Sequence, residues 1–211
     1  MANATGNDER IQGPRLSGPL DSTAIVSSPT LAPSSVGRQN EVSLRLADAA
    51  DAPCLSALAT QVFLATYALS GIRLAFAREV EAHFSVATFL ERLRQPTGRT
   101  LLAERAGHLI AFAEIVLGAR HALVPAGSAE LARLYVQTPF LRQGVGRQLL
   151  AQAEALASTE CAPALWLTAW VGNERALAFY ASQGYEQLGV TEYTFQGESF
   201  ENRLFAKSLV S

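Results

Sequence analysis

The sequence predicts a mixed α/β domain in which a mostly antiparallel sheet is flanked by helices. Stretches that alternate apolar and polar residues, as strands do, are interspersed with stretches whose apolar residues recur at helical spacing. A length of 211 residues with 49% apolar composition suffices for one domain with its own core. We expect residues 41–209 to form this domain. Residues 1–40, rich in Gly, Pro, Ser, Thr and Asn, are predicted to be a disordered N-terminal extension.

The first elements of the predicted domain are a strand and three helical stretches. Residues 42–46 alternate apolar and polar side chains, which indicates a strand. Asp48 or Asp51 can then cap a helix that runs toward Tyr67. Two further helical stretches follow within residues 67–93, with breaks near Ser-Gly and Phe-Ser pairs.

The middle of the domain is predicted to be a hairpin followed by a single strand. Residues 100–104 and 109–117 are strand-like and are joined by an Ala-Gly-His turn, and residues 130–136 form the next strand. A strand at residues 165–170, a helix from Asn173 and closing strands complete the succession. We therefore expect the sheet to be antiparallel at first and parallel later.

Residues 131–150, LARLYVQTPFLRQGVGRQLL, carry the main functional signal. A short strand runs into a Gly-Val-Gly loop that opens a helix, where the first N–H groups have no intrahelical partner and lie at the positive end of the helix dipole. Gly144 and Gly146 let the backbone turn sharply and approach a ligand, and Arg142 and Arg147 add positive charge. The loop is predicted to hold a pyrophosphate. A strand-to-helix turn without a ligand is the other interpretation.

Missing residues narrow the class of phosphate ligand. A nucleotide-hydrolase loop needs Lys followed by Ser or Thr after its last glycine, and no lysine follows either glycine here. The dinucleotide fingerprint needs a third glycine, but Leu149 stands at that position. Both of these classes are therefore excluded.

Residues 165–185 supply a second motif, and together the two motifs resemble the GCN5-related N-acetyltransferase superfamily. Members carry a strand, a Q/R-x-x-G-x-G/A loop and a helix that hold the pyrophosphate of acetyl-CoA, followed by N-x-x-A-x-x-F-Y-x-x-x-G-F. The second motif is matched by Asn173, Ala176, Phe179, Tyr180, Gly184 and Tyr185. The first position of the loop motif is Leu141 in place of Gln or Arg, so Arg142 or Gln143 would have to compensate.

The resemblance implies acetyl-CoA as the cosubstrate, with no metal. It places the pyrophosphate on the loop and the pantetheine arm along an exposed strand edge, where backbone N–H groups also polarise the carbonyl. Asn173 either only caps its helix or also touches the cofactor. The predicted cofactor-binding residues are Leu134, Tyr135, Val136, Arg142, Gln143, Gly144, Val145, Gly146, Arg147 and Asn173.

Acetyl transfer to an amine requires a base for the amine and an acid for the leaving thiolate. The resemblance assigns the acid to Tyr180, whose alternative role is core packing. Glu130, at the start of a strand, is the predicted base, and its alternative is a solvated edge position. Glu114 is a further candidate for the base. Some family members place a glutamate in the strand where this chain has Thr168.

The acceptor is predicted to be a small-molecule amine, because the C-terminal part looks like bacterial small-molecule and polyamine acetyltransferases. A polyamine would need acidic walls, which Glu79, Glu81, Glu91 and Glu130 could supply. Tyr67, His83 and Phe84 are candidate substrate neighbours, with core packing as the alternative. The other functional interpretations are N-terminal acetylation of ribosomal proteins, an acetyl-CoA sensor without turnover, and a purely structural domain.

Charge and composition argue against several other partners. A net charge of −2 and the lack of a Lys/Arg run disfavour nucleic acid and membrane surfaces. Cys54 and Cys161 are expected to be buried free thiols in a reducing, cytoplasmic setting. The three histidines are too scattered for a metal motif. A homodimer is possible, although no interface is evident.

Overall fold

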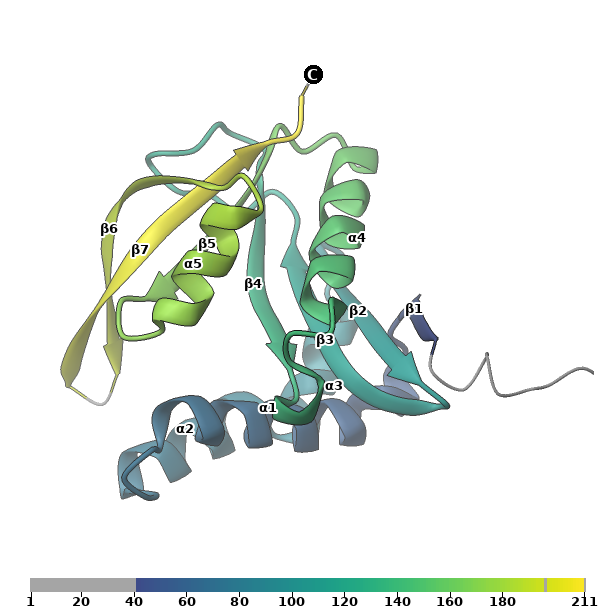
Figure 1. Cartoon of the computed structure of the whole chain (residues 1–211), viewed down its shortest axis with the longest axis vertical. Coiled ribbons are helices and arrows are strands. Elements are labelled where there is room, and N and C mark those ends of the chain that lie inside the picture. The colour runs from purple at the N-terminus through teal and green to yellow at the C-terminus, as the bar shows by residue number, and fades with distance from the viewer. Residues whose placement is uncertain (1–40, 196, 211) are drawn as a thin grey trace, which may run out of the picture. The chain divides into compact units, whose positions relative to one another are not determined.

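A computed structural model describes residues 41–195 and 197–210 (Figure 1). The predicted disordered extension at residues 1–40 lies outside the described residues. The strands are β1 (Val42–Leu46), β2 (Gly98–Arg105), β3 (His108–Val116), β4 (Ala129–Val136), β5 (Ala164–Trp170), β6 (Glu186–Phe195) and β7 (Glu198–Ser208). The helices are α1 (Ala52–Tyr67), α2 (Leu74–Phe84), α3 (Val86–Arg94), α4 (Val145–Thr159) and α5 (Glu174–Ser182), with short 3-10 turns at Ala49–Asp51 and Thr138–Phe140.

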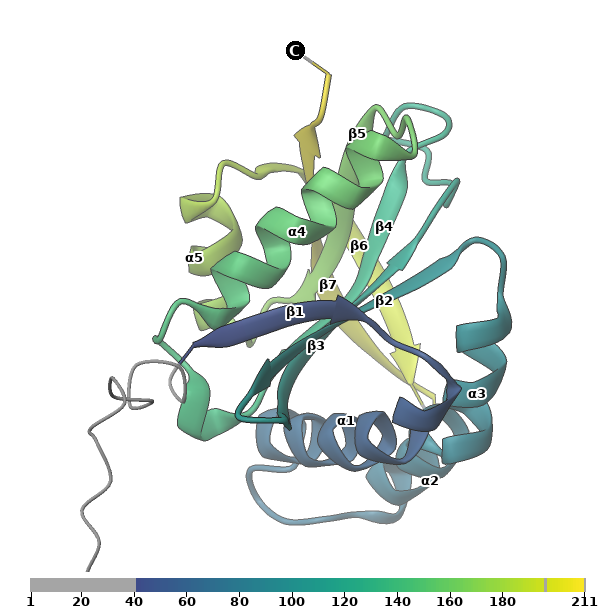
Figure 2. The ribbon, with the colours of Figure 1, turned by 90° about the vertical axis from the view of Figure 1, so that its right-hand side faces the viewer.

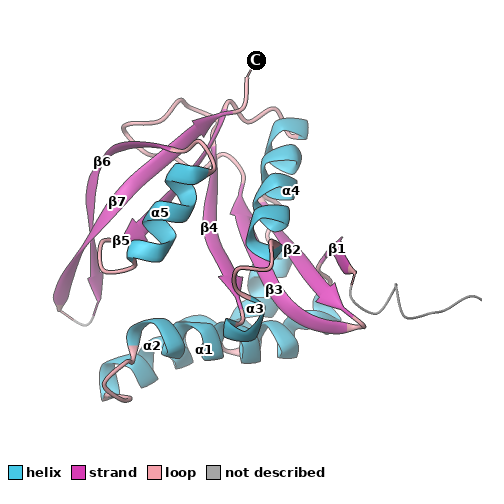
Figure 3. Ribbon diagram, in the orientation of Figure 1, coloured by secondary structure: helices cyan, strands magenta, loops and turns pink. Residues whose placement is uncertain are grey.

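The strands form one sheet in the order β1-β2-β3-β4-β5-β7-β6 (Figure 3). Every neighbouring pair is antiparallel except β4 and β5, which confirms a mixed, mostly antiparallel sheet. The expectation that the later part is parallel holds only for that pair. The chain reaches β7 through a hairpin from β6, so β7 runs antiparallel between β5 and β6.

Helices cover both faces of the sheet (Figure 2). On one face, the apolar stripe of α4 and the buried side of α5 pack on the strands, with Leu149, Leu165 and Tyr180 in the same core cluster. On the other face, α1, α2 and α3 enclose a second cluster that includes Phe63, Phe89 and Phe112 of β3. The two cores fix the sheet between them.

Local signals set the start of the first helices. The Asp48 side chain accepts from a backbone N–H of the 3-10 turn at Ala49–Asp51, while the Asp51 carboxylate accepts from the Asp48 N–H at 2.8 Å, so the two residues form a capping box for this turn. The turn leads directly into α1, where Asp51 is the N-cap residue but makes no side-chain cap hydrogen bond. Ser85 ends α2 in extended backbone and caps α3 by accepting from the Thr88 N–H at 3.2 Å.

A bulge and an early end to strand pairing open the sheet at β4. The register of β3 against β4 shifts between Glu114 and Ile115, which leaves Ala132 of β4 without a partner on β3. On its other side, β4 pairs with β5 only at Ala129 and Glu130. Beyond Glu130 the two strands diverge toward the helices of the lower layer in Figure 1. The edge of β4 that faces β5 is therefore unpaired from residue 131 onward.

The predicted burial of the two cysteines was wrong, although both are free thiols as expected. Cys54 and Cys161 are both exposed, because Cys54 lies on the outer side of α1 and Cys161 lies in the turn after α4. No helix among the described residues has the length and apolar character needed to cross a membrane. Within the same residues, no group of three or more His, Cys, Asp or Glu side chains could hold a metal ion.

Candidate functional site

Two cavities meet where β4 and β5 diverge. The first, which we call the loop cavity, has a volume of about 270 Å³ and lies between the Gly-Val-Gly loop, β4 and α5. The second, which we call the aromatic cavity, has a volume of about 330 Å³ and lies between α1, α2, β4, β5 and the β6–β7 hairpin. Six of the described residues line both cavities: Tyr67, Leu134, Tyr135, Asn173, Ala176 and Tyr180.

The loop cavity is bordered by unsatisfied backbone N–H groups. Gly144 is the N-cap of α4 and has a φ of 82°, a left-handed conformation that favours glycine. Within the described part of the chain, the N–H groups of residues 142–147 donate to no backbone or side-chain oxygen. A Cβ on Gly146 would lie 3.7 Å from Val136 and 3.8 Å from Phe179, so the missing side chain leaves space on the cavity side. The loop therefore offers N–H donors to an anion.

The four other predicted loop residues divide into two pairs. Arg142, with a φ of 61°, and Arg147 line the loop cavity. The side chain of Gln143 is held away from it, because it accepts from Arg105 at 3.0 Å and donates to the Pro139 carbonyl at 2.7 Å. Val145 is fully buried in the core beneath the loop. Gln143 and Val145 can therefore contribute only backbone N–H groups.

The open edge of β4 presents alternate backbone groups to the cavities. The Gln137 N–H donates to the Ile110 carbonyl of β3 at 3.0 Å. Hydrogen-bonding direction alternates along an antiparallel strand, so the Tyr135 N–H also turns toward β3, and those of Leu134 and Val136 turn toward the open edge. Tyr135 contributes its side chain, which lines both cavities.

Asn173 and Tyr180 lie on α5 at the junction of the cavities. The Asn173 side chain caps the helix by accepting from the Ala176 N–H at 3.2 Å, which leaves its own NH₂ group available. Tyr180 is 8% exposed and packs against Phe179 with ring centroids 5.2 Å apart. Its hydroxyl has no hydrogen-bond partner among the described residues. Burial, and then the phenol of Tyr67, raise the pKa of Tyr180, so its proton is retained at neutral pH.

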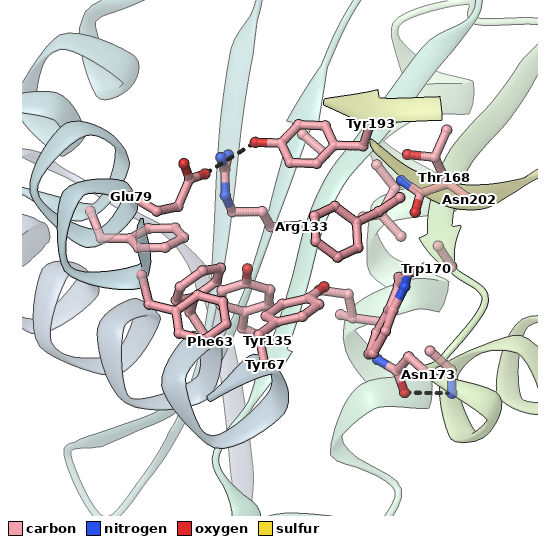
Figure 4. A pocket seen from close by; sticks show the side chains of 18 of the residues that line it. Phe63, Tyr67, Glu79, Arg133, Tyr135, Thr168, Trp170, Asn173, Tyr193 and Asn202 are labelled. Atoms are coloured by element: carbon pink, nitrogen blue, oxygen red, sulfur yellow. Dashed lines mark hydrogen bonds between the residues drawn. The ribbon is translucent and has the colours of Figure 1, made fainter. Parts of the chain in front are cut away.

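Among the residues that the structure describes, the aromatic cavity is lined mainly by rings and by a single carboxylate. Nine of the twenty described lining residues are aromatic: Phe63, Tyr67, Phe76, Phe84, Tyr135, Trp170, Tyr180, Tyr193 and Phe200. Glu79 of α2 is 9% exposed and accepts from the Tyr193 hydroxyl of β6 at 3.1 Å. Figure 4 shows these two side chains pointing toward each other, with Phe63, Tyr67 and Tyr135 on one side and Trp170 across from them.

Trp170 is held in place by a glycine. A Cβ on Gly172 would lie 2.4 Å from two atoms of the Trp170 ring, so the ring packs directly on the Gly172 backbone. In this position the ring faces Tyr67, with centroids 5.6 Å apart. The turn between β5 and α5 thus fixes one wall of the aromatic cavity.

The structure does not bring the two predicted base candidates to the cavities. Glu130 pairs with Trp166 across the strands and lines neither cavity, and burial raises the pKa of its carboxyl while Arg133 opposes that shift. Glu114 is buried and accepts from Arg133 at 2.6 Å. Of the candidate substrate neighbours, Tyr67 and Phe84 line the aromatic cavity, whereas the exposed His83 does not.

Sequence reasoning missed several cavity residues. Tyr193 and Asn202, on the β6–β7 hairpin, reach the aromatic cavity from strands whose position cannot be inferred from local patterns. Arg133 lines it as well, and its place beside the bulge became evident only with the strand register. Arg175 lines the loop cavity next to the predicted cap, where its charge was the one available signal.

Comparisons with known proteins agree with this geometry. The sequence model of the Acetyltransferase (GNAT) family matches residues 66–185. An uncharacterised N-acetyltransferase of Lactobacillus delbrueckii subsp. lactis is 32% identical over 81 residues, which cover 38% of this chain and 47%, about half, of that protein.

Two solved structures share the fold. The PaiA N-acetyltransferase from Thermoplasma acidophilum, in complex with coenzyme A, superposes with a TM-score of 0.63 at 20% identity, covering 80% of this chain and 99% of that one. A ribosomal-protein-alanine N-acetyltransferase from Brucella melitensis gives a TM-score of 0.61 at 26% identity, covering 78% and 98%. With more than half of its length matched by the family, the chain belongs to the acetyltransferase (GNAT) family and is an N-acetyltransferase whose cosubstrate is acetyl-CoA.

Proposed function

We propose that this N-acetyltransferase transfers the acetyl group directly to a primary amine of a small molecule. The observation that carries the proposal is the position of Tyr180, which lies where the loop cavity and the aromatic cavity meet and has an unengaged hydroxyl. A donor entering from one side and an acceptor entering from the other would meet at this residue. The polyamine-like identity of the acceptor stays a prediction.

The residues around the loop cavity fit the pyrophosphate and pantetheine of coenzyme A. The free N–H groups of residues 142–147, with the guanidinium groups of Arg142 and Arg147, would hold the pyrophosphate. The open-edge N–H groups of Leu134 and Val136 are suited to pair with the amide groups of the pantetheine arm.

The chemistry needs two proton movements around one nucleophilic attack. Acetyl-CoA supplies the acetyl group as a thioester. The neutral amine attacks the acetyl carbon, the new carbon–nitrogen bond forms, and the carbon–sulfur bond breaks. Tyr180 would give its proton to the departing sulfur, and its raised pKa supports this role because the phenol keeps that proton over the whole physiological range.

Removal of the amine proton is the less defined step. Glu130 stays the predicted base, but it lines neither cavity, so it would have to act through water molecules. Its raised pKa, caused by burial, would make it a stronger base than an ordinary glutamate. The pH dependence of a Glu130→Gln variant tests this assignment.

A screen of acceptors tests the proposal. The enzyme is incubated with acetyl-CoA and with small primary amines, polyamines or a peptide bearing an N-terminal alanine, and release of free thiol is followed. We expect turnover with small amines. Preferential turnover of the peptide would instead support a ribosomal-protein-type enzyme, an activity named for the Brucella relative. Thermal stabilisation by coenzyme A without thiol release under any condition would leave a sensor and refute the enzymatic proposal.

A further inference from the structure

We propose that Arg105 is a positioning residue for coenzyme A, which braces the Gly-Val-Gly loop through Gln143 and holds it ready for the pyrophosphate. This inference rests on the pyrophosphate placement in the proposed function and deepens it, because it gives a role to a residue outside the loop motif. Three observations carry it: free N–H groups in the loop, two linked hydrogen bonds that join the loop to β2, and a guanidinium beside the Phe140 ring.

The loop has few backbone hydrogen bonds of its own. In the preceding turn, the Leu141 N–H donates to the Thr138 carbonyl at 3.2 Å. The next backbone donor along the described chain is Gln148, whose N–H donates to the Gly144 carbonyl at 3.0 Å. Between them, Arg142 has a φ of 61°, a conformation that residues other than glycine rarely adopt. Such a backbone persists only where its surroundings hold it, so side-chain contacts must keep the loop in shape.

The Gln143 side chain supplies such contacts in two directions. Its oxygen accepts from Nη1 of Arg105 at 3.0 Å, and its nitrogen donates to the Pro139 carbonyl at 2.7 Å. The amide therefore ties the loop to the 3-10 turn before it, and Arg105 ties both to β2. Gln143 directly precedes Gly144, the N-cap of α4, so the brace acts next to the helix start that presents the N–H donors.

Arg105 is well fixed at its own end. It is the last residue of β2, and its backbone pairs with Val42 of β1 and His108 of β3. Its guanidinium carbon lies 5.3 Å from the centroid of the Phe140 ring, a cation–π distance. Among the described residues the guanidinium donates to Gln143 alone, and its buried Nε has no partner. Arg105 lines neither cavity, so it would act on the ligand through the loop.

A braced loop matters because the loop offers the ligand mainly backbone donors. Leu141 stands where the family motif has Gln or Arg, and the Gln143 side chain is engaged in the brace. Backbone N–H groups bind an anion best when they are already in place, because binding then requires no further ordering of the loop. We therefore expect loss of the brace to weaken coenzyme A binding and to leave the chemical step unchanged.

Arg105→Met tests this role, because methionine keeps an apolar stem and removes the donor. Calorimetric titration of coenzyme A should show a Kd raised by about threefold to tenfold, the effect of one lost hydrogen bond. The kcat and the KM for the amine should not change. Arg99→Met is the matched control on the same strand. Arg99 donates to Glu160 at the opposite end of α4, at 3.0 Å, so this variant should bind coenzyme A as the parent does.

Gln143→Leu distinguishes a brace from direct attraction between Arg105 and the phosphates, because it keeps the charge of Arg105. We expect it to raise the Kd by at least as much as Arg105→Met does. The double variant should bind no more weakly than Gln143→Leu, because both changes break the same brace. An unchanged Kd in Gln143→Leu, or losses that add in the double variant, would overturn the brace. The Gln143 variant also tests the contact should Arg105→Met fail to fold.

The placement of the pyrophosphate is tested separately. A double variant, Arg142→Gln with Arg147→Gln, removes the two charges that line the loop cavity and should raise the Kd for coenzyme A by about tenfold or more. If this variant binds weakly and Arg105→Met binds normally, the brace alone is overturned. If neither changes the Kd, the placement falls with the brace. Both measurements are made without an acceptor, so they leave transfer to a small amine to the screen described above.

Discussion

Replacement of Gly146 by alanine should stabilise the protein and leave its affinity for coenzyme A unchanged, whereas the same change at Gly144 should cost stability. Gly146 is the second residue of α4, and its added Cβ would meet Val136 and Phe179 at 3.7 and 3.8 Å, which is ordinary van der Waals contact. Alanine restricts the unfolded chain more than glycine does, so the free energy of unfolding should rise by about 0.5–1 kcal/mol. For a chain of this size, the melting temperature should rise by about 1–4 °C.

Coenzyme A binding should be unaffected by this change. The loop motif of the family accepts Gly or Ala at this position, and the added methyl group would contact protein side chains, so we expect the Kd for coenzyme A to change by less than about threefold. A tenfold change would remove about 1.4 kcal/mol of stabilisation at saturating ligand, which is large enough to be detected. Thermal unfolding with and without coenzyme A, together with calorimetric titration, measures both effects on the same preparation.

Gly144→Ala provides the comparison, because it tests the left-handed conformation of the loop. Since Gly144 has a φ of 82°, alanine there should cost about 1–2 kcal/mol of stability. Gly146→Ala has no such cost. A Gly146→Ala protein that is less stable than the parent, or that binds coenzyme A tenfold more weakly, would refute this reasoning.

Three further substitutions test the junction and its surroundings. Tyr180→Phe should lower kcat by about 100-fold or more and leave the affinity for coenzyme A unchanged. The free energy of unfolding should also stay unchanged, because the Tyr180 hydroxyl has no hydrogen-bond partner among the described residues. A normal kcat would remove Tyr180 from the mechanism. Gly172→Ala should displace the Trp170 ring and lower the free energy of unfolding by about 1–3 kcal/mol. Steady-state kinetics should show a raised KM for the amine and an unchanged KM for acetyl-CoA. Glu130→Gln should gain stability relative to the parent as the pH rises above about 4.5, because burial raises the pKa of the Glu130 carboxyl in the folded parent and its ionisation then opposes folding. Denaturant titrations across pH measure this difference in stability. If the acidic limb of the kcat/KM profile is the same in the variant, the base lies elsewhere.

The sequence was most informative where the chemistry is local. The strand, glycine loop and helix at residues 131–150 are contiguous, and the cap at Asn173 and the ring of Tyr180 lie on one short helix. Spacing, together with the resemblance to the acetyltransferase family, therefore predicted most of the residues that line the loop cavity. The alternating pattern of residues 42–46 and the paired caps at Asp48 and Asp51 located the first strand and helix in the same way.

Long-range strand pairing was beyond the reach of such patterns. The order of β5, β7 and β6 depends on a hairpin folding back across the sheet, and nothing in the sequence of that hairpin specifies its neighbour. The bulge at Ala132 also depends on long-range pairing, because the residue is left without a partner only by the register between β4 and β3. The burial predicted for Cys54 and Cys161 failed because their apolar neighbours face the core while the thiols do not.

The same distinction explains why the donor side of the site is better defined than the acceptor side. The loop cavity is built largely from backbone N–H groups, whose positions follow from a helix start and an open strand edge. The aromatic cavity instead depends on side chains from α2 and β6, and the contact between Glu79 and Tyr193 joins residues 114 positions apart. Acceptor specificity can therefore change through a few side chains on the helix and the hairpin, while the backbone that we propose to hold coenzyme A stays the same.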